Sequence, residues 1–82
     1  MQLALSETAE REYKKIPKRE QAKIKKKLAS IKNDPYSGKK LGGELAKYYS
    51  VRAWPYRIIY GINKEENKIE VHKIQHRHGA YK

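Results

Sequence analysis

Apolar and polar positions divide the chain into a helical first half and a second half with strand-like alternation. Leu3 and Leu5 alternate weakly with polar or small neighbours over residues 2–5, which predicts a short first strand. Ser6 follows, with acidic residues in the next turn. A serine N-cap followed by acidic residues favours the start of a helix, because both suit the free N–H groups at that end.

Two apolar stripes at helical spacing lie on either side of Pro17. Each repeats at i, i+4 and i+7, as one buried face of a helix requires. The stripes are Ala9, Tyr13 and Ile16, then Ile24, Leu28 and Ile31. Pro35 ends the second helix, because the residue before a proline disfavours helical backbone. Two helices joined at Pro17 are expected to form an antiparallel hairpin.

The second half of the chain predicts a loop and three strands. Residues 34–46 are punctuated by glycine and proline, which is typical of a loop. Three segments with period-two alternation predict successive antiparallel strands. They span residues 48–53, 56–62 and 68–75. In the last segment the apolar parity changes between Val71 and Ile74, and either a bulge or a two-faced strand would explain this.

These elements predict an α+β fold. Their order is strand-helix-helix-strand-strand-strand, with the helical hairpin packed on one face of an antiparallel sheet. The length of 82 residues indicates one domain spanning residues 1–82, with a thin margin of stability and no room for a cofactor domain.

The absence of Cys excludes disulfides and thiolate metal sites and fits a reducing compartment. No apolar run approaches the roughly 20 residues that a membrane span needs. The apolar stretch at the N-terminus is too short for a signal peptide. We therefore expect a complete, cytoplasmic protein.

The charge of the chain is the strongest indication of the kind of partner that it binds. Lys and Arg number 20 against 9 Asp and Glu, for a formal net charge of +11, which favours a polyanionic partner. The residues expected to bind RNA or the ribosome are Lys18, Arg19, Lys23, Lys25, Lys26, Lys27, Lys39 and Lys40. A helix with lysines on most exposed faces suits sequence-independent phosphate binding, and the alternative is a solvated helix face. A membrane helix is disfavoured, since the apolar stripe is narrow and needed for the core.

Arginines form the first candidate site. Alternation sends Ser50 and Arg52 to the face opposite Val51, and Arg57 to the face opposite Ile58. If the apolar set meets the helices, these arginines share the free face. Guanidinium groups grip phosphate with paired donors and can stabilise the charge that grows during attack on phosphorus. The alternative is a set of exposed arginines on a solvated sheet.

The second candidate is the C-terminal run, which holds His72, His76, Arg77, His78 and Tyr81. RNA is cut without metal when its own 2′-OH attacks the neighbouring phosphate, and histidine suits the acid or base role. We interpret His72 as a strand residue on the sheet surface. His76 and His78 are either proton-transfer groups or part of a tail without fixed structure. A zinc site is disfavoured, because they flank an arginine.

Other chemistries lack their usual residues. No glycine-rich phosphate loop follows a strand, no acidic pair is spaced for a metal, and no Ser–His–Asp grouping is apparent. The sequence therefore argues against an ATPase and a metal-dependent nuclease, and we expect neither a metal nor a cofactor.

Three segments taken together resemble the RelE/ParE toxin superfamily. They are YYSVR at 48–52, PYRIIY at 55–60 and HRHGAY at 76–81. The resemblance covers nearly the whole chain. It implies two helices on a curved antiparallel sheet and co-expression with an antitoxin, which we expect to be acidic. For the RelE branch it implies metal-independent cleavage of messenger RNA in the ribosomal A site, and hence inhibition of translation.

The resemblance also implies roles by position. Arg57 matches the arginine that stabilises the scissile phosphate, Arg77 the tail arginine that acts as acid or phosphate ligand, and Tyr81 the tail tyrosine that orients or stacks the substrate. Arg52 matches one of two basic residues on the strand before the turn. Ser50 departs from the pattern, because the other basic residue is expected there.

The departure at Ser50 leaves the general base open, and His76 or His78 could substitute. Two other functions compete with cleavage. The ParE-like branch poisons DNA gyrase, but tends to lack the tail residues, so Arg77 and Tyr81 favour the ribonuclease. A non-catalytic RNA- or ribosome-binding domain of the same fold is the third possibility.

Overall fold

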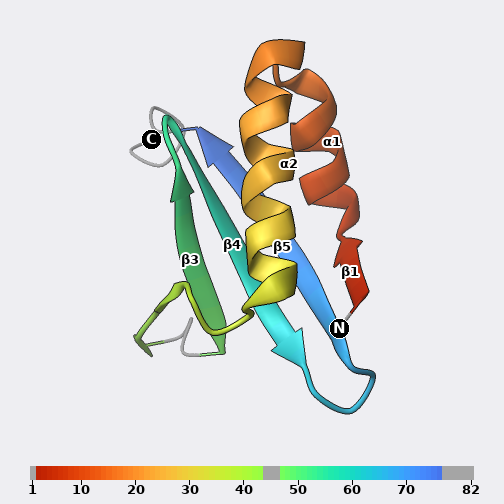
Figure 1. Cartoon of the computed structure of the whole chain (residues 1–82), viewed down its shortest axis with the longest axis vertical. Coiled ribbons are helices and arrows are strands. Elements are labelled where there is room, and N and C mark those ends of the chain that lie inside the picture. Colours follow the sequence, from red (N-terminus) through yellow and green to blue (C-terminus); the bar gives the residue numbers. More distant parts are fainter. Residues whose placement is uncertain (1, 44–46, 77–82) are drawn as a thin grey trace.

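Two helices lie against one face of a five-stranded sheet in the computed structural model, which describes residues 2–43 and 47–76 (Figure 1). In chain order the elements are β1 (Gln2–Leu5), α1 (Glu7–Lys15), α2 (Lys18–Asn33), β2 (Lys39–Lys40), β3 (Tyr48–Ala53), β4 (Tyr56–Asn63) and β5 (Lys68–His76). The strand order across the sheet is β1-β5-β4-β3-β2. The predicted α+β class and the helical hairpin on one face are confirmed.

The sheet is mixed rather than wholly antiparallel. Strands β3, β4 and β5 form the predicted antiparallel meander, but β1 pairs in parallel with β5. Parallel pairing depends on a long crossover, here the whole helical hairpin and the meander, so no local sequence pattern indicates it. Strand β2 lies inside the predicted loop 34–46 and pairs with β3 over two residues. Two residues are too few to show alternation.

The start of α1 is tied to the edge of β5. Ser6 is the predicted N-cap: its Oγ accepts a hydrogen bond from the Ala9 N–H at 3.0 Å and donates one to the His72 carbonyl at 2.8 Å. Glu12 Oε1 accepts a hydrogen bond from the Ile74 N–H at 2.9 Å. These side chains pair backbone groups of β5 on the side where β1 has already ended, so that edge is closed by α1.

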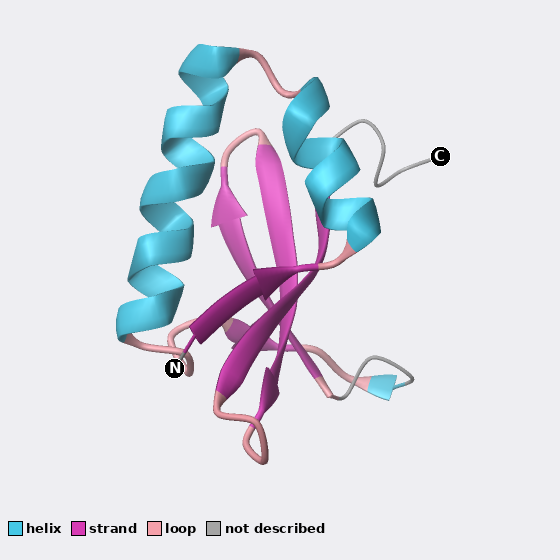
Figure 2. Cartoon of the chain, turned by 90° about the vertical axis from the view of Figure 1, so that its right-hand side faces the viewer, coloured by secondary structure: helices cyan, strands magenta, loops and turns pink. Residues whose placement is uncertain are grey.

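Both predicted apolar stripes enter the core. Ala9 and Ile16 from the first stripe and all three residues of the second are buried, and Tyr13 packs against them. Their partners on the sheet are Ala53, Ile58, Tyr60, Ile69, Val71 and Ile74. Helix α1 contacts β5 and α2 contacts β3, so the pair diverges over a twisted sheet (Figure 2).

A bulge in β5 explains the change in apolar parity. Ile59 pairs with Lys73, whereas the next residue, Tyr60, pairs with Val71. His72 is therefore the extra residue in β5. One additional residue reverses the alternation, so Val71 and Ile74 both face the helices. The bulge, not a two-faced strand, is the correct alternative.

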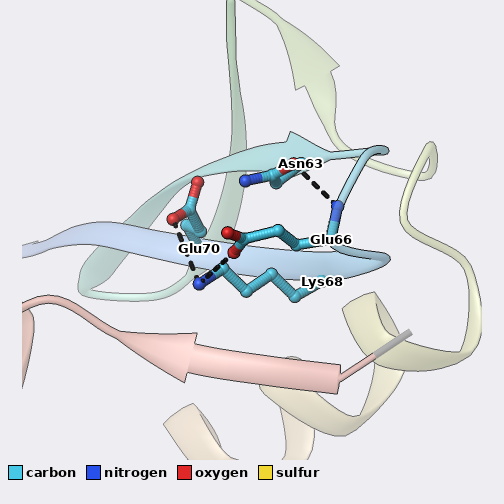
Figure 3. Close-up of polar contacts among 4 residues, drawn as sticks. All are labelled: Asn63, Glu66, Lys68 and Glu70. Carbon is cyan, nitrogen blue, oxygen red and sulfur yellow. Dashed lines mark hydrogen bonds and ion pairs between the residues drawn. The ribbon is translucent and has the colours of Figure 1, made fainter.

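Polar side chains close the turn between β4 and β5 (Figure 3). Asn63 Oδ1 accepts a hydrogen bond from the Glu66 N–H at 3.1 Å, and Asn67 takes the left-handed backbone that the turn needs, with φ 54°. Lys68 lies 2.7 Å from Glu66 and 3.8 Å from Glu70. The hydrogen bond to Glu66 is the main reason why the pKa of Lys68 is raised.

Tyr60 fixes the loop that follows α2. Its ring is fully buried, and its hydroxyl donates a hydrogen bond to the Pro35 carbonyl at 2.8 Å and accepts one from the Gly38 N–H at 3.2 Å. Burial raises the pKa of Tyr60, so the phenol keeps its proton at neutral pH and can donate. The loop, and with it β2, is thus held against β3.

A methyl group at Gly38 should weaken this anchor. A Cβ there would lie 2.5 Å from the Tyr60 hydroxyl and 3.1 Å from the Ser50 carbonyl, so the loop or the ring must move. We expect Gly38→Ala to lower the free energy of unfolding by about 1–3 kcal/mol in urea titrations. Gly42→Ala is the matched control: among residues 2–43 and 47–76 no atom is found within 4 Å of its Cβ, and the change should stay within about 0.5 kcal/mol. Equal effects of the two substitutions would contradict the anchor.

Candidate anion-binding site

Two arginines stand side by side on the face of the sheet turned away from the helices. Arg52 of β3 pairs directly with Arg57 of β4, and both side chains are exposed. Directly opposed residues of an antiparallel pair have Cβ atoms roughly 4.5–5.5 Å apart. The neighbouring pair, Val51 and Ile58, faces the helices, which confirms the predicted assignment of faces.

The arginine pair has no acidic partner among residues 2–43 and 47–76. The ion pairs found there join Lys23 to Glu20, and Lys68 to Glu66 and Glu70. Like charges placed directly opposite each other on a sheet destabilise it. An anion that accepts hydrogen bonds from both guanidinium groups would relieve this repulsion, so the pair is suited to a phosphate.

A groove of about 360 Å³ lies on this face beside the pair. Its lining includes Arg52, Arg57, Ser50, Gly38 and Lys39. The volume is in the range of small-ligand sites. One wall is the loop that Tyr60 anchors, so the shape of the groove depends on that buried hydroxyl.

Lys39 is a site residue that the sequence pattern did not single out from the other lysines. It pairs with Ser50 across β2 and β3, on the arginine face. The position where the resemblance expects a second basic residue is therefore occupied by serine, but a lysine lies directly across from it. Only the pairing of β2 with β3 shows this, because 39 and 50 are remote in sequence.

His76 does not join the arginine face. It pairs with Tyr56, and the two rings make an edge-on contact at 5.1 Å between centroids. Tyr56 packs against the core, whereas Arg57, the next residue, pairs with Gln75. Because successive residues of a strand point to opposite faces, His76 is turned toward the helix side. This separates His76 from the arginines with which the sequence grouped it.

Three of the predicted catalytic residues, Arg77, His78 and Tyr81, lie outside the described residues. His72 lies on the arginine face, where its ring stacks on Tyr48 at 5.0 Å between centroids. This agrees with the interpretation of His72 as a strand residue on the sheet surface. The stacked pair lies beside Gly61, at the end of the sheet remote from the arginines.

All eight residues of the predicted RNA- or ribosome-binding set are exposed. The structure does not gather them on one surface. Lys39 belongs to the groove beside the arginines, whereas Lys23, Lys26 and Lys27 face β3 along one side of α2. Lys25 falls between them in sequence but about 100° from Lys26 around the helix.

No helix in the described part of the chain is long and apolar enough to cross a membrane.

Comparisons with known proteins agree with the fold. Residues 3–81 match the family model described as the ParE toxin of a type II toxin–antitoxin system, parDE. No curated protein sequence matches the chain. A chain of the RelBE2 toxin–antitoxin complex from Mycobacterium tuberculosis is 29% identical, with a TM-score of 0.84, over 93% of this chain and 96% of that one.

Two further solved structures extend the likeness. A chain of the heterotetrameric YoeB–YefM toxin–antitoxin complex from Staphylococcus aureus is 25% identical, with a TM-score of 0.77, over 93% of this chain and 95% of that one. The isolated RelE toxin of E. coli has the same fold, with 23% identity and a TM-score of 0.78, over 92% of this chain and 82% of that one. The resemblance to the RelE/ParE superfamily is confirmed.

Proposed function

Because the chain belongs to the ParE toxin family of type II toxin–antitoxin systems, within the RelE/ParE superfamily, we propose that it cleaves messenger RNA on the ribosome and so inhibits translation. The observation that carries this proposal is the pairing of Arg52 with Arg57 on the open face of the sheet, without an acidic partner in the described ranges. Two fixed positive charges fit the phosphate at which an RNA chain is cut.

The proposed reaction needs no group from outside the RNA and the protein. The 2′-oxygen attacks the adjacent phosphorus, the P–O2′ bond forms and the P–O5′ bond breaks. The products are a 2′,3′-cyclic phosphate and a 5′-hydroxyl. Negative charge accumulates on the non-bridging oxygens during attack, and Arg57 and Arg52 stabilise it there. Arg77 would protonate the leaving oxygen or add a third contact, and Tyr81 would stack on or orient the substrate.

Lys39 supports the same site. Its position opposite Ser50 places an ammonium group beside the arginine pair. In the proposal, this charge takes the place of the basic residue that is missing at position 50. Lys39 would then act on the substrate phosphates, and Lys40 and the lysines of α2 would contact other phosphates of the RNA or the ribosome.

Proton transfer from the 2′-OH is assigned to His78. Of the two histidines considered from the sequence, His76 is turned to the other face of β5. We expect His78→Ala to slow cleavage of translated messenger RNA by about 10²–10⁴-fold, and His76→Ala to retain most of the activity. Wild-type cleavage by the His78 variant would exclude this role.

An acidic antitoxin is the proposed protein partner. The RelBE2 and YoeB–YefM structures are toxin–antitoxin complexes. The arginine face is basic, and the whole chain has a formal net charge of +11. Such a surface would attract an acidic segment that folds on binding. Such a segment would cover Arg52 and Arg57, or displace the last residues of the chain, and thereby block the phosphate site.

Inhibition of DNA gyrase is the second candidate, because the matching family model is that of the ParE toxin. The two activities leave different products. A ribonuclease leaves cuts in translated messenger RNA, whereas a gyrase poison leaves breaks in DNA that require gyrase. A domain that only binds the ribosome leaves neither.

Arg57→Ala should remove most of the cleavage. Loss of one charge-stabilising donor typically costs about 10²–10³-fold in rate, so cuts mapped by primer extension on translated messenger RNA should fall by that factor. Growth arrest on induction should weaken in parallel. Arg11→Ala is the matched control, since Arg11 is an exposed arginine on α1. An Arg57 variant that cuts at the wild-type rate would contradict the proposal, and gyrase-dependent DNA breaks without RNA cuts would establish the second candidate.

A further inference from the structure

A second basic groove lies next to the arginine face, on the helix side of the sheet edge. It has a volume of about 230 Å³ and lies between α2 and the end of β3. The described residues that line it are Lys23, Lys26, Lys27, Arg52, Ala53 and Trp54. Figure 1 shows the turn between β3 and β4 at the same end of the molecule as the first turns of α2. The three lysines form one stripe of the helix, spaced at i, i+3 and i+4.

This groove combines strong positive charge with a large exposed aromatic side chain. Of the six described residues that line it, four are cationic and none is acidic. Trp54 is 58% exposed, although Ala53 beside it is buried. More than half of this side chain is accessible to solvent, so a flat apolar group that stacks on the indole would gain hydrophobic stabilisation.

Arg52 connects the two grooves, since it lines both. The paired register of β2 reaches only Tyr49 and Ser50 of β3. Among the described strands, β3 is therefore the sheet edge at Arg52, and nothing in those strands separates the arginine face from the groove at Trp54. A chain of phosphates that leaves the arginine pair can pass Arg52 and continue toward the lysines of α2.

The chemistry of the groove fits a single-stranded nucleic acid. Unpaired bases stack on aromatic side chains, and Lys and Arg hold the flanking phosphates. Bases in a duplex are already stacked and offer no free face. A peptide made of acidic residues alone would match the charges, but its carboxylates would not stack on the indole. An unpaired nucleotide satisfies both features of the groove.

We propose that this groove binds an unpaired nucleotide of single-stranded RNA, with its base stacked on Trp54 and its flanking phosphates on Lys23, Lys26 and Lys27. The proposal rests on the proposed function, because it follows the same RNA strand from the arginine pair around Arg52. It identifies Trp54 as a contact to the base of a nucleotide near the cleaved bond.

Intrinsic fluorescence tests the proposal directly, because Trp54 is the only Trp of the chain. The probe is a 2′-O-methyl octa-adenylate, which cannot be cut since its 2′-oxygens are blocked. Titration should quench the fluorescence in a saturable way. Octa-glutamate, which carries charge without bases, should leave the emission nearly unchanged. Equal quenching by octa-glutamate would overturn the assignment to RNA and indicate a peptide-binding groove.

Variants separate stacking from charge. With a labelled probe and anisotropy as the readout, Trp54→Leu should weaken binding of the octa-adenylate by about 5- to 150-fold, the effect of losing one stacked base. Trp54→Tyr keeps an aromatic ring and should restore most of the affinity. Tyr36→Leu is the matched control, since Tyr36 is 53% exposed but does not line the groove. Unchanged affinity of Trp54→Leu would overturn the proposal.

The lysine stripe has a control outside the predicted RNA-binding residues. Lys26→Gln should reduce the slope of log affinity against log salt by about one, whereas Lys64→Gln, an exposed lysine in the turn between β4 and β5, should leave it nearly unchanged. Equal slopes for the two variants would contradict a specific path along the groove. Because the probe cannot be cleaved, these results stand apart from the nuclease assay. If Arg57→Ala cut RNA at the wild-type rate and so contradicted the nuclease proposal, the binding test would still be valid.

Discussion

The alternation of β4 is the constraint on which the rest of the structure depends. Ile58 and Tyr60 enter the core beneath the helices, so Arg57 is forced to the opposite face. The register with β3 then sets Arg52 directly beside it. A slip of one residue would bury a guanidinium group and expose Ile58, which costs far more than the repulsion between two exposed charges. Packing of the core thus holds two like charges together, and their repulsion favours an anionic ligand.

The same register builds the walls around that pair. The ring of Tyr60 lies in the core, and its hydroxyl forms hydrogen bonds with the loop at Pro35 and Gly38. The same loop continues into β2, where Lys39 pairs with Ser50. At the edge of β3, Arg52 leads from this groove to the one that contains Trp54. Basic side chains therefore continue from the open face of the sheet to α2, and the substrate proposed for this toxin is a polymer that can follow such a path.

Much of this could be predicted from local patterns. Helical spacing identified the buried stripes, Ser6 was recognisable as an N-cap, and period-two alternation assigned Arg52 and Arg57 to one face. The rest depends on contacts between remote residues. The parallel pairing of β1 with β5 and the short β2 follow from the path of the whole chain. The bulge at His72 was visible only as an ambiguity, because two arrangements explain one change of parity. His76 was grouped with the arginines by its proximity in sequence to Arg77, whereas alternation in β5 turns it toward Tyr56.

A double-mutant cycle on the cleavage rate tests most directly whether Arg52 and Arg57 act on one phosphate. The rates of wild type, Arg52→Ala, Arg57→Ala and the double variant would be measured on the same translated messenger RNA. If both guanidinium groups hold the same phosphate, the two losses are coupled. The increase in activation free energy of the double variant is then smaller than the sum of the two single increases by about 0.5–3 kcal/mol. Losses that multiply without coupling would show that the two arginines act independently and would contradict a shared phosphate site.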